Sequence, residues 1–128
     1  MKFPGICLVS EDVPALVRFY SEILGCQPEG DDIHAEFVLD GLGLAIFTRQ
    51  GMEEMAPGSM RSAGHGGVTL DFEVDDVDAE HARLTALGVP VVKPPATYPW
   101  GARSAWFRDP DGNIVDFYSR VAGEQRTK

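Results

Sequence analysis

The sequence predicts an α+β fold made of two tandem βαβββ modules, because one pattern occurs twice along the chain. An aspartate–valine pair opens a helix at Asp12-Val13 and again, 64 residues later, at Asp76-Val77. The two helices end at similar leucine–glycine pairs, Leu24-Gly25 and Leu87-Gly88. A short apolar strand precedes each helix, and about three strands follow it. Because a helix covers only one face of its sheet, the other face must meet the second module, another chain or a ligand.

The first module begins with an apolar strand at residues 6–9. Asp12 then caps a helix whose apolar side recurs every three or four residues. The members of this apolar side are Leu16, Phe19, Tyr20, Ile23 and Leu24. Two strands, at residues 33–39 and 42–48, flank the turn pair Asp40-Gly41 and predict a hairpin.

Residues 49–66 have no clear apolar period, and we expect them to form an irregular linker between the modules. The segment contains Met52, Met55, Pro57 and Met60, together with several glycines. A loop of this length is either a plain connector or a functional element, since methionine-rich loops can repack around ligands.

The second module contains the most regular strand, residues 68–74, in which apolar and polar side chains alternate. The helix that follows has a predicted buried side made of Val77, His81, Leu84 and Leu87. We expect a short strand at residues 89–92, ended by Lys93-Pro94-Pro95. Strands at residues 103–108 and 114–118 then flank a dense turn. The predicted boundaries are about 3–48 for module one, 49–66 for the linker, 67–120 for module two and 121–128 for a tail.

Composition narrows the class of protein further. The chain has 128 residues, 44% of them hydrophobic and 24% charged, which fits one folded domain. Its net charge of −9 disfavours binding to nucleic acid, because an acidic surface repels phosphate. We expect no membrane span, because no apolar run is long enough, and we expect no secretory leader. Its two cysteines, Cys7 and Cys26, predict reduced thiols and a cytoplasmic location.

Three segments of this chain resemble the vicinal oxygen chelate superfamily, which includes glyoxalase I, extradiol dioxygenases and bleomycin-resistance proteins. They are Asp12 through Gly25, Phe72 through Ala79, and Phe107-Arg108-Asp109-Pro110-Asp111-Gly112-Asn113. The resemblance extends over nearly the whole chain. It implies that the sheets of the two modules curl into a cup that holds a small ligand (the glyoxalase/bleomycin-resistance fold).

Enzymes of that superfamily hold a metal in the cup at four positions, usually with His, Gln or Glu. When the family's positions are located in this sequence by counting from the helix-opening aspartates, they correspond to Gly5, Ala45, Thr69 and Asp116. Only Asp116 has a side chain that is a strong metal ligand, and a single carboxylate holds a divalent ion weakly. We therefore expect no metal and no other cofactor, with Asp116 as the one remaining metal candidate. The histidines, which we do not expect to act as ligands, are His34, His65 and His81.

Alternation along the strands predicts which polar side chains line the cup. They are Thr69, Asp71, Asp116 and Tyr118. Two carboxylates beside an apolar surface favour a cationic or hydrogen-bond-donating ligand, and they are also candidates for a general acid and base. Alternatively, Asp71 is paired with an arginine such as Arg103 or Arg108.

Aromatic side chains are the second sign of a ligand site. Trp100 lies in the loop Tyr98-Pro99-Trp100-Gly101, where an indole offers a stacking surface for a planar ligand. A similar Trp-Gly pair followed by an arginine occurs in metal-free, drug-sequestering members of the superfamily. Phe47, Trp106 and Phe37 are either further cup residues or core residues. Cys7 is a candidate for the cup wall, with no catalytic role expected.

The function expected first is therefore metal-free binding and sequestration of a small, antibiotic-like molecule that is planar or a cationic aromatic. The alternative is a divalent-metal-dependent lyase, isomerase or dioxygenase, which the missing ligands at Gly5, Ala45 and Thr69 oppose. Metal-independent catalysis, with Asp71 or Asp116 as general base, is a third possibility. We expect a homodimer, because small sheets are usually covered by a second chain. A cup built within one chain and a cup built between two chains both fit the sequence.

Overall fold

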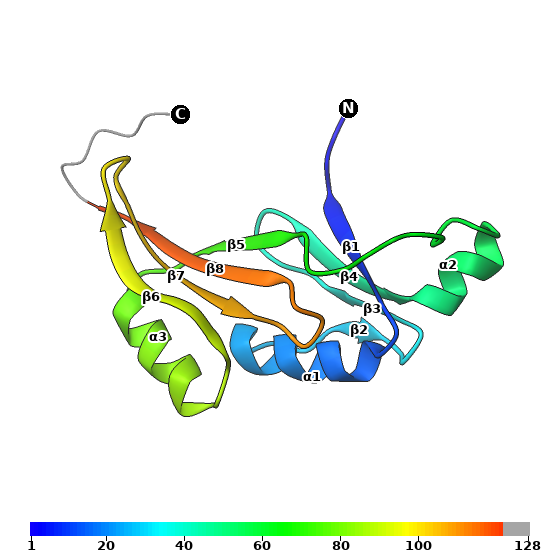
Figure 1. Ribbon diagram of the computed structural model, residues 1–128, viewed down its shortest axis with the longest axis horizontal. Helices are drawn as coiled ribbons and strands as arrows, with labels where there is room; N and C mark the ends of the chain where they lie inside the picture. Colours follow the sequence, from blue (N-terminus) through cyan, green and yellow to red (C-terminus); the bar gives the residue numbers. More distant parts are fainter. Residues whose placement is uncertain (122–128) are drawn as a thin grey trace. The chain divides into compact units, whose positions relative to one another are not determined.

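The computed structural model describes residues 1–121 and confirms the predicted fold class (Figure 1). The chain divides into two units, the first ending at Gly64 and the second beginning at His65. Each unit contains one four-stranded mixed sheet with a helix on one face. The predicted tail, apart from Val121, lies outside the described residues. No helix within residues 1–121 has the length and apolar character needed to cross a membrane.

The first unit has the strand order β1-β4-β3-β2. Strands β1 and β4 are parallel, and the other neighbours are antiparallel. Its elements are β1 (Gly5–Ser10), α1 (Val13–Leu24), β2 (Glu29–Gly30), β3 (His34–Phe37), β4 (Gly43–Thr48) and α2 (Arg49–Met55). The two-residue strand β2 was not predicted from the sequence.

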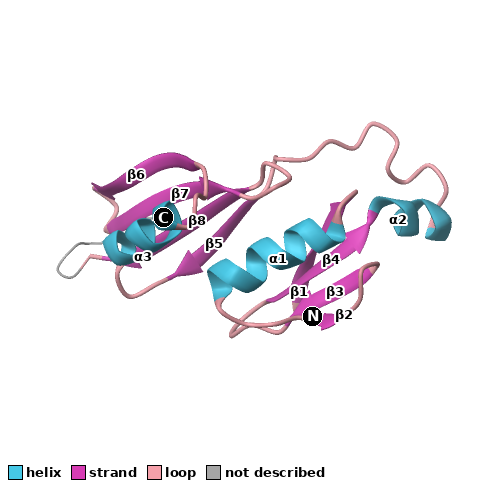
Figure 2. Cartoon of the chain, turned by 90° about the horizontal axis from the view of Figure 1, so that it is seen from below, coloured by secondary structure: helices cyan, strands magenta, loops and turns pink. Residues whose placement is uncertain are grey.

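Helix α1 forms where capping and periodicity predicted it. The Oδ1 atom of Asp12 accepts a hydrogen bond from the Ala15 N–H at 3.1 Å, and Gly25 ends the helix with a φ of 71°. The helix lies over one face of its sheet (Figure 2). Its buried side chains pack against β3 and β4 in the first core. This core comprises Leu8, Val13, Leu16, Tyr20, Ile23, Ala35, Phe37, Leu44 and Ile46.

The prediction of an irregular linker was wrong for residues 49–55, which form helix α2. Thr48 caps this helix by accepting the Gly51 N–H at 2.9 Å. The Glu53 carboxylate then accepts the N–H groups of Gly58 at 2.7 Å and Met60 at 2.8 Å, which orders the turn that follows. Local hydrogen bonds of this kind leave no apolar period in the sequence, so hydrophobic patterning could not reveal them.

The second unit repeats the arrangement with the strand order β5-β8-β7-β6. Its elements are β5 (Thr69–Glu73), α3 (Val77–Ala86), β6 (Val91–Tyr98), β7 (Ala102–Arg108) and β8 (Ile114–Arg120). Strand β5 runs parallel to β8, and β7 is antiparallel to both β6 and β8. The core on the helix side comprises Leu70, Val77, Leu84, Val89, Ala105, Phe107, Val115 and Phe117.

Helix α3 differs in part from its predicted pattern. Val77 and Leu84 are buried as expected, but Leu87 is 44% exposed because the helix ends at Ala86. The His81 ring lies 6.0 Å from the Phe107 ring, so this histidine packs beside the core.

Strand β6 also differs from the prediction, because it continues through Lys93-Pro94-Pro95 to Tyr98. β6 is the outermost strand of its sheet. Prolines are tolerated in such a strand, since N–H groups on its open side need no partner in the sheet. The pairing of β6 with β7 is irregular on both sides of Lys93.

The turn between β7 and β8 sets the register of the strands that carry the site. The buried Asp109 accepts the N–H groups of Asp111 and Asn113 on Oδ1, each at 2.9 Å. Its Oδ2 accepts the side-chain amide of Asn113, also at 2.9 Å. With this turn closed, Asp116 lies beside Asp71 on one neighbouring strand and beside Trp106 on the other.

Candidate functional site

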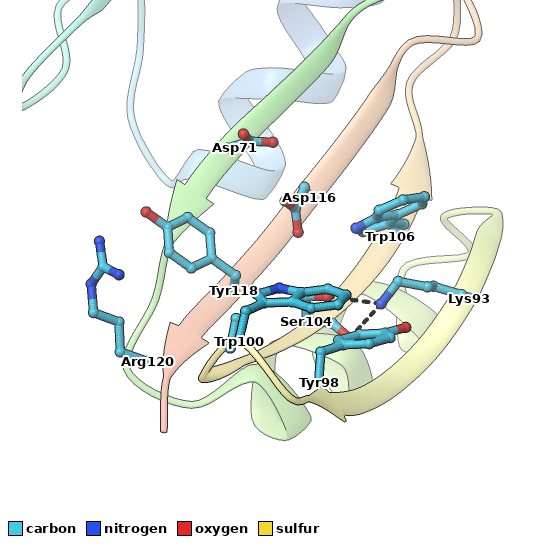
Figure 3. Close-up of a pocket in the computed structure, with 10 residues that line it drawn as sticks. Asp71, Lys93, Tyr98, Trp100, Ser104, Trp106, Asp116, Tyr118 and Arg120 are labelled. Atoms are coloured by element: carbon cyan, nitrogen blue, oxygen red, sulfur yellow. Dashed lines mark hydrogen bonds between the residues drawn. The ribbon is translucent and has the colours of Figure 1, made fainter. Parts of the chain in front are cut away.

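A cavity of about 440 Å³ lies in the second unit (Figure 3). Alternation along β5, β7 and β8 directs its lining side chains away from α3, while their sequence neighbours form the core. The lining residues are Asp71, Lys93, Tyr98, Trp100, Ala102, Ser104, Trp106, Asp116, Tyr118 and Arg120. The structure therefore brings together five predicted candidates, which are Asp71, Trp100, Trp106, Asp116 and Tyr118.

Two carboxyl groups share the wall formed by β5 and β8. Asp71 and Asp116 are register partners on these parallel strands. The Oδ1 atom of Asp116 is buried and has no hydrogen-bond partner among the described residues. Burial raises the pKa of Asp116 to about 7, and hydrogen bonding and charge from Asp71 contribute to the rise. The positive charge of Lys93 and the Trp106 side chain act on this pKa in the opposite direction.

The alternative in which Asp71 pairs with an arginine was wrong. Arg103 points to the helix side, where its Nη2 lies 2.8 Å from Oδ1 of Asp78. Arg108 donates a hydrogen bond to the Gly112 carbonyl oxygen at 2.7 Å. Neither of these guanidinium groups pairs with Asp71, which lines the cavity beside Asp116.

Aromatic rings form another part of the lining. The rings of Tyr98 and Trp100 are stacked, with centroids 4.9 Å apart and planes 10° apart. A turn presents Trp100, because Gly101 has a φ of 86° and its N–H donates to the Tyr98 carbonyl oxygen. Trp100 is 50% exposed and Trp106 is 36% exposed. Trp106 therefore belongs to the cavity wall and not to the core.

Lys93 was not recognised as a site residue from the sequence. Its Nζ donates hydrogen bonds to the carbonyl oxygen of Ser104 at 2.9 Å and to its Oγ at 2.8 Å. The same atom lies 4.7 Å from the Tyr98 ring centroid and 5.0 Å from the Trp106 ring centroid, within the range of cation–π attraction.

Four other lining residues were also absent from the predicted set. They are Tyr98, Ala102, Ser104 and Arg120. Period-two alternation from Trp106 along the strand would have found Ser104 and Ala102. No comparable pattern marks Lys93, because the pairing of β6 is irregular around it.

The remaining candidates lie outside this lining. Thr69 begins β5 as the register partner of Ile114. Phe47 and Cys7 belong to the first unit, where the Phe47 ring lies 5.6 Å from the His34 ring and Cys7 is exposed. Phe37, the other proposed wall residue, is fully buried in the first core.

The residues at the four expected metal positions do not fit a bound metal. In the first unit the expected positions Gly5 and Ala45 lie on the paired strands β1 and β4, and neither residue has a side-chain donor atom. No three His, Cys, Asp or Glu residues within residues 1–121 form a group that could hold a metal ion. His65 does not compensate for this loss, because its Nδ1 lies 3.0 Å from the Asp111 carbonyl oxygen in a loop contact.

Comparisons with known proteins agree with this fold. Residues 2–117 match the model of the Glyoxalase/Bleomycin resistance protein/Dioxygenase superfamily. The uncharacterized protein YraH of Bacillus subtilis (strain 168) is 31% identical over 94% of this chain and 100% of YraH. A crystal structure of a glyoxalase/bleomycin resistance protein/dioxygenase from Nocardioides gives a TM-score of 0.82 at 28% identity, over 100% of this chain and 89% of that chain.

A more distant similarity connects the chain with an enzyme structure. The lactoylglutathione lyase from Agrobacterium tumefaciens gives a TM-score of 0.74 at 25% identity, over 92% of each chain. The family-model match extends over both units of the chain. The chain therefore belongs to the Glyoxalase/Bleomycin resistance protein/Dioxygenase superfamily.

Proposed function

We propose that the protein binds and sequesters a small, antibiotic-like aromatic molecule, planar or cationic, without a metal. The observation that carries this proposal is the half-exposed Trp100 indole, stacked on Tyr98 beside a cavity of about 440 Å³. Cavities of this size accept small organic molecules, and exposed indoles are effective stacking surfaces for planar rings.

The lining offers both stacking and polar contacts to such a ligand. Tyr98 supports one face of the Trp100 indole, so a ligand ring can stack without first ordering that side chain. Asp71 and Asp116 supply carboxyl groups on the wall formed by β5 and β8. A carboxylate attracts a ligand cation, and a protonated carboxyl donates a hydrogen bond to a ligand acceptor.

The alternative function is a divalent-metal-dependent lyase, isomerase or dioxygenase. Superfamily membership and the similarity to the Agrobacterium tumefaciens lyase structure favour it. Gly5 and Ala45 argue against it, because neither residue has a side-chain donor atom for a metal at its expected position. The donor set therefore supports the metal-free proposal over the enzyme.

Two experiments test the proposal. The first screens planar neutral, cationic and anionic aromatic compounds for quenching of tryptophan fluorescence, followed by calorimetry of each compound that quenches. We expect saturable binding of a planar compound with one site per chain. The second is elemental analysis of the untreated protein, for which we expect no stoichiometric metal. One tightly held metal ion per chain would favour the enzyme instead.

We also propose that the protein acts as a homodimer. Apolar side chains such as Ile33, Val38 and Val68 are exposed in the single chain, and a second copy could cover such surface. Light scattering on the eluting peak of a sizing column tests this proposal, with twice the chain mass of 13.9 kDa as the expected value. A peak of single-chain mass at all protein concentrations would contradict it.

A further inference from the structure

We propose that Lys93 determines which ligands the cavity accepts, and that it selects planar aromatic molecules carrying a hydrogen-bond-accepting oxygen, such as a carboxylate, over aromatic cations. This inference rests on the proposed function of the cavity and defines the class of ligand more narrowly.

The backbone of β6 presents Lys93 to the cavity. The pairing of β6 with β7 shifts between Val91 and Lys93 and again between Lys93 and Ala96. Pro94 and Pro95, within the second interval, have no N–H to donate to the sheet. Lys93 is the register partner of Trp106, and its side chain reaches the cavity beside that indole and Ser104 (Figure 3).

The contacts of Lys93 hold its ammonium group in one position. Ser104 accepts two hydrogen bonds from Nζ. The ammonium group also lies over the rings of Tyr98 and Trp106, at distances within the range of cation–π attraction. An ammonium group has three N–H donors, so one donor has no acceptor among residues 1–121. A half-buried, fixed cation with a donor to spare is ready to bind an oxygen of a ligand.

The other cation in the lining, Arg120, already has an ion-pair partner. Arg120 lies 3.7 Å from a carboxylate oxygen of Glu73, and its guanidinium lies 5.9 Å from the Tyr118 ring centroid. Lys93 is therefore the cation of the lining that has no ion pair among the described residues. A ligand ring stacked on Trp100 would have Lys93 near one part of its edge and Asp116 near another.

This arrangement determines which polar groups on a ligand the cavity favours. An oxygen acceptor on the ring gains a charge-assisted hydrogen bond from Lys93. A donor group on the ring can approach the Asp116 carboxyl group, which lines the same cavity. An ammonium group placed near Lys93 is repelled instead, and the Tyr98 and Trp106 rings beside it are already in contact with Nζ.

Three probes with the same ring system test this inference by calorimetry. They are 2-naphthoate, the neutral 2-naphthamide and the cationic 2-naphthylmethylammonium. We expect the wild-type protein to bind the carboxylate at least about tenfold more tightly than the cation, as one charge-assisted hydrogen bond allows. The amide, which carries an acceptor without a charge, is expected to fall between them.

Substitutions at Lys93 separate its role from a general charge effect. Lys93→Met should weaken 2-naphthoate binding about tenfold and leave the affinity for the cationic probe unchanged or higher. Lys93→Arg should keep the preference for the carboxylate, because it keeps the positive charge. Arg83→Met is the matched control, because it removes one positive charge from α3 and Arg83 is not in the lining. Circular dichroism of each variant establishes that it is folded.

The possible failures are distinguishable. Equal losses for all three probes in Lys93→Met, or no preference in the wild-type protein, would overturn the role of Lys93. If Trp100→Ala still weakens all three probes in that case, the proposed function stands without this inference. If no probe binds the wild-type protein at millimolar concentration, the proposed function fails and this inference fails with it.

Discussion

Asp71 and Asp116 are register partners on the parallel strands β5 and β8, and both side chains line the same cavity. Two ionised carboxylates side by side repel one another, and burial of Asp116 adds a further cost to its charged form. The fold therefore holds a proton on this pair at a pH where an isolated aspartate would have lost it.

The first prediction concerns the pH dependence of stability. The pKa of Asp116 is raised from 3.8 to about 7 in the folded protein, so between these values the folded state binds more protons than the unfolded state. The stabilisation from this group is therefore complete below about pH 4 and is lost as the pH rises to about 7. Asp116→Asn should flatten this part of the profile, as measured by urea midpoints from pH 4 to 8.

The control for this prediction is Asp32→Asn, which changes an exposed aspartate in the first unit by the same chemistry. It should leave the slope between pH 4 and 7 as in the wild-type protein. A profile for Asp116→Asn that matches the wild-type profile would show that Asp116 titrates normally.

The second prediction concerns Trp100. Trp100→Ala should weaken binding of a planar ligand by about 2 kcal/mol or more, as expected for an aromatic anchor, and should change the urea midpoint little. The side chain is half exposed, so its removal leaves no core cavity. Calorimetric titration with a compound found by fluorescence quenching provides the measurement.

Phe3→Ala is the matched control for Trp100→Ala, since Phe3 is 72% exposed and lies outside the cavity lining. Equal affinities of the wild-type protein and Trp100→Ala would remove Trp100 from the binding site.

The third prediction concerns metal binding. Titration of chelator-treated protein with Mn²⁺, Ni²⁺, Zn²⁺ and Fe²⁺ should show only weak binding, because Asp116 is the one strong ligand at the four expected positions. Any weak binding should decrease in Asp116→Ala. Tight uptake that survives in Asp116→Ala would point to a metal site elsewhere in the protein.

The fourth prediction concerns the turn that aligns β7 and β8. Asp109→Ala should destabilise the protein by about 2–3 kcal/mol, because it removes buried hydrogen bonds to Asp111 and Asn113. Urea unfolding measures this loss. Asp40→Ala, at an exposed turn, is the comparison and should change stability by less than about 0.5 kcal/mol. Similar small changes in both variants would show that the Asp109 contacts contribute little.

Capping and periodicity made the two modules predictable. The aspartates at 12 and 76 accept N–H groups three residues further on, and these are local contacts that a sequence pattern records. Alternation along the strands likewise placed Asp71, Asp116 and Tyr118 on the face opposite α3, because side-chain direction in a strand follows a period of two.

The sequence by itself determined the repeated modules, their helices and which strand residues share a face, because these follow from local hydrogen bonding and period. Tertiary structure decided the rest of the site. Only the packing of α3 against β7 shows that Arg103 meets Asp78, and only the pairing of β5 with β8 places Asp71 beside Asp116. Only the irregular edge strand β6 carries Lys93 to Ser104 and to the rings of Tyr98 and Trp106. Packing selects these partners, which lie five to thirteen residues away in the chain, and no sequence spacing marks them.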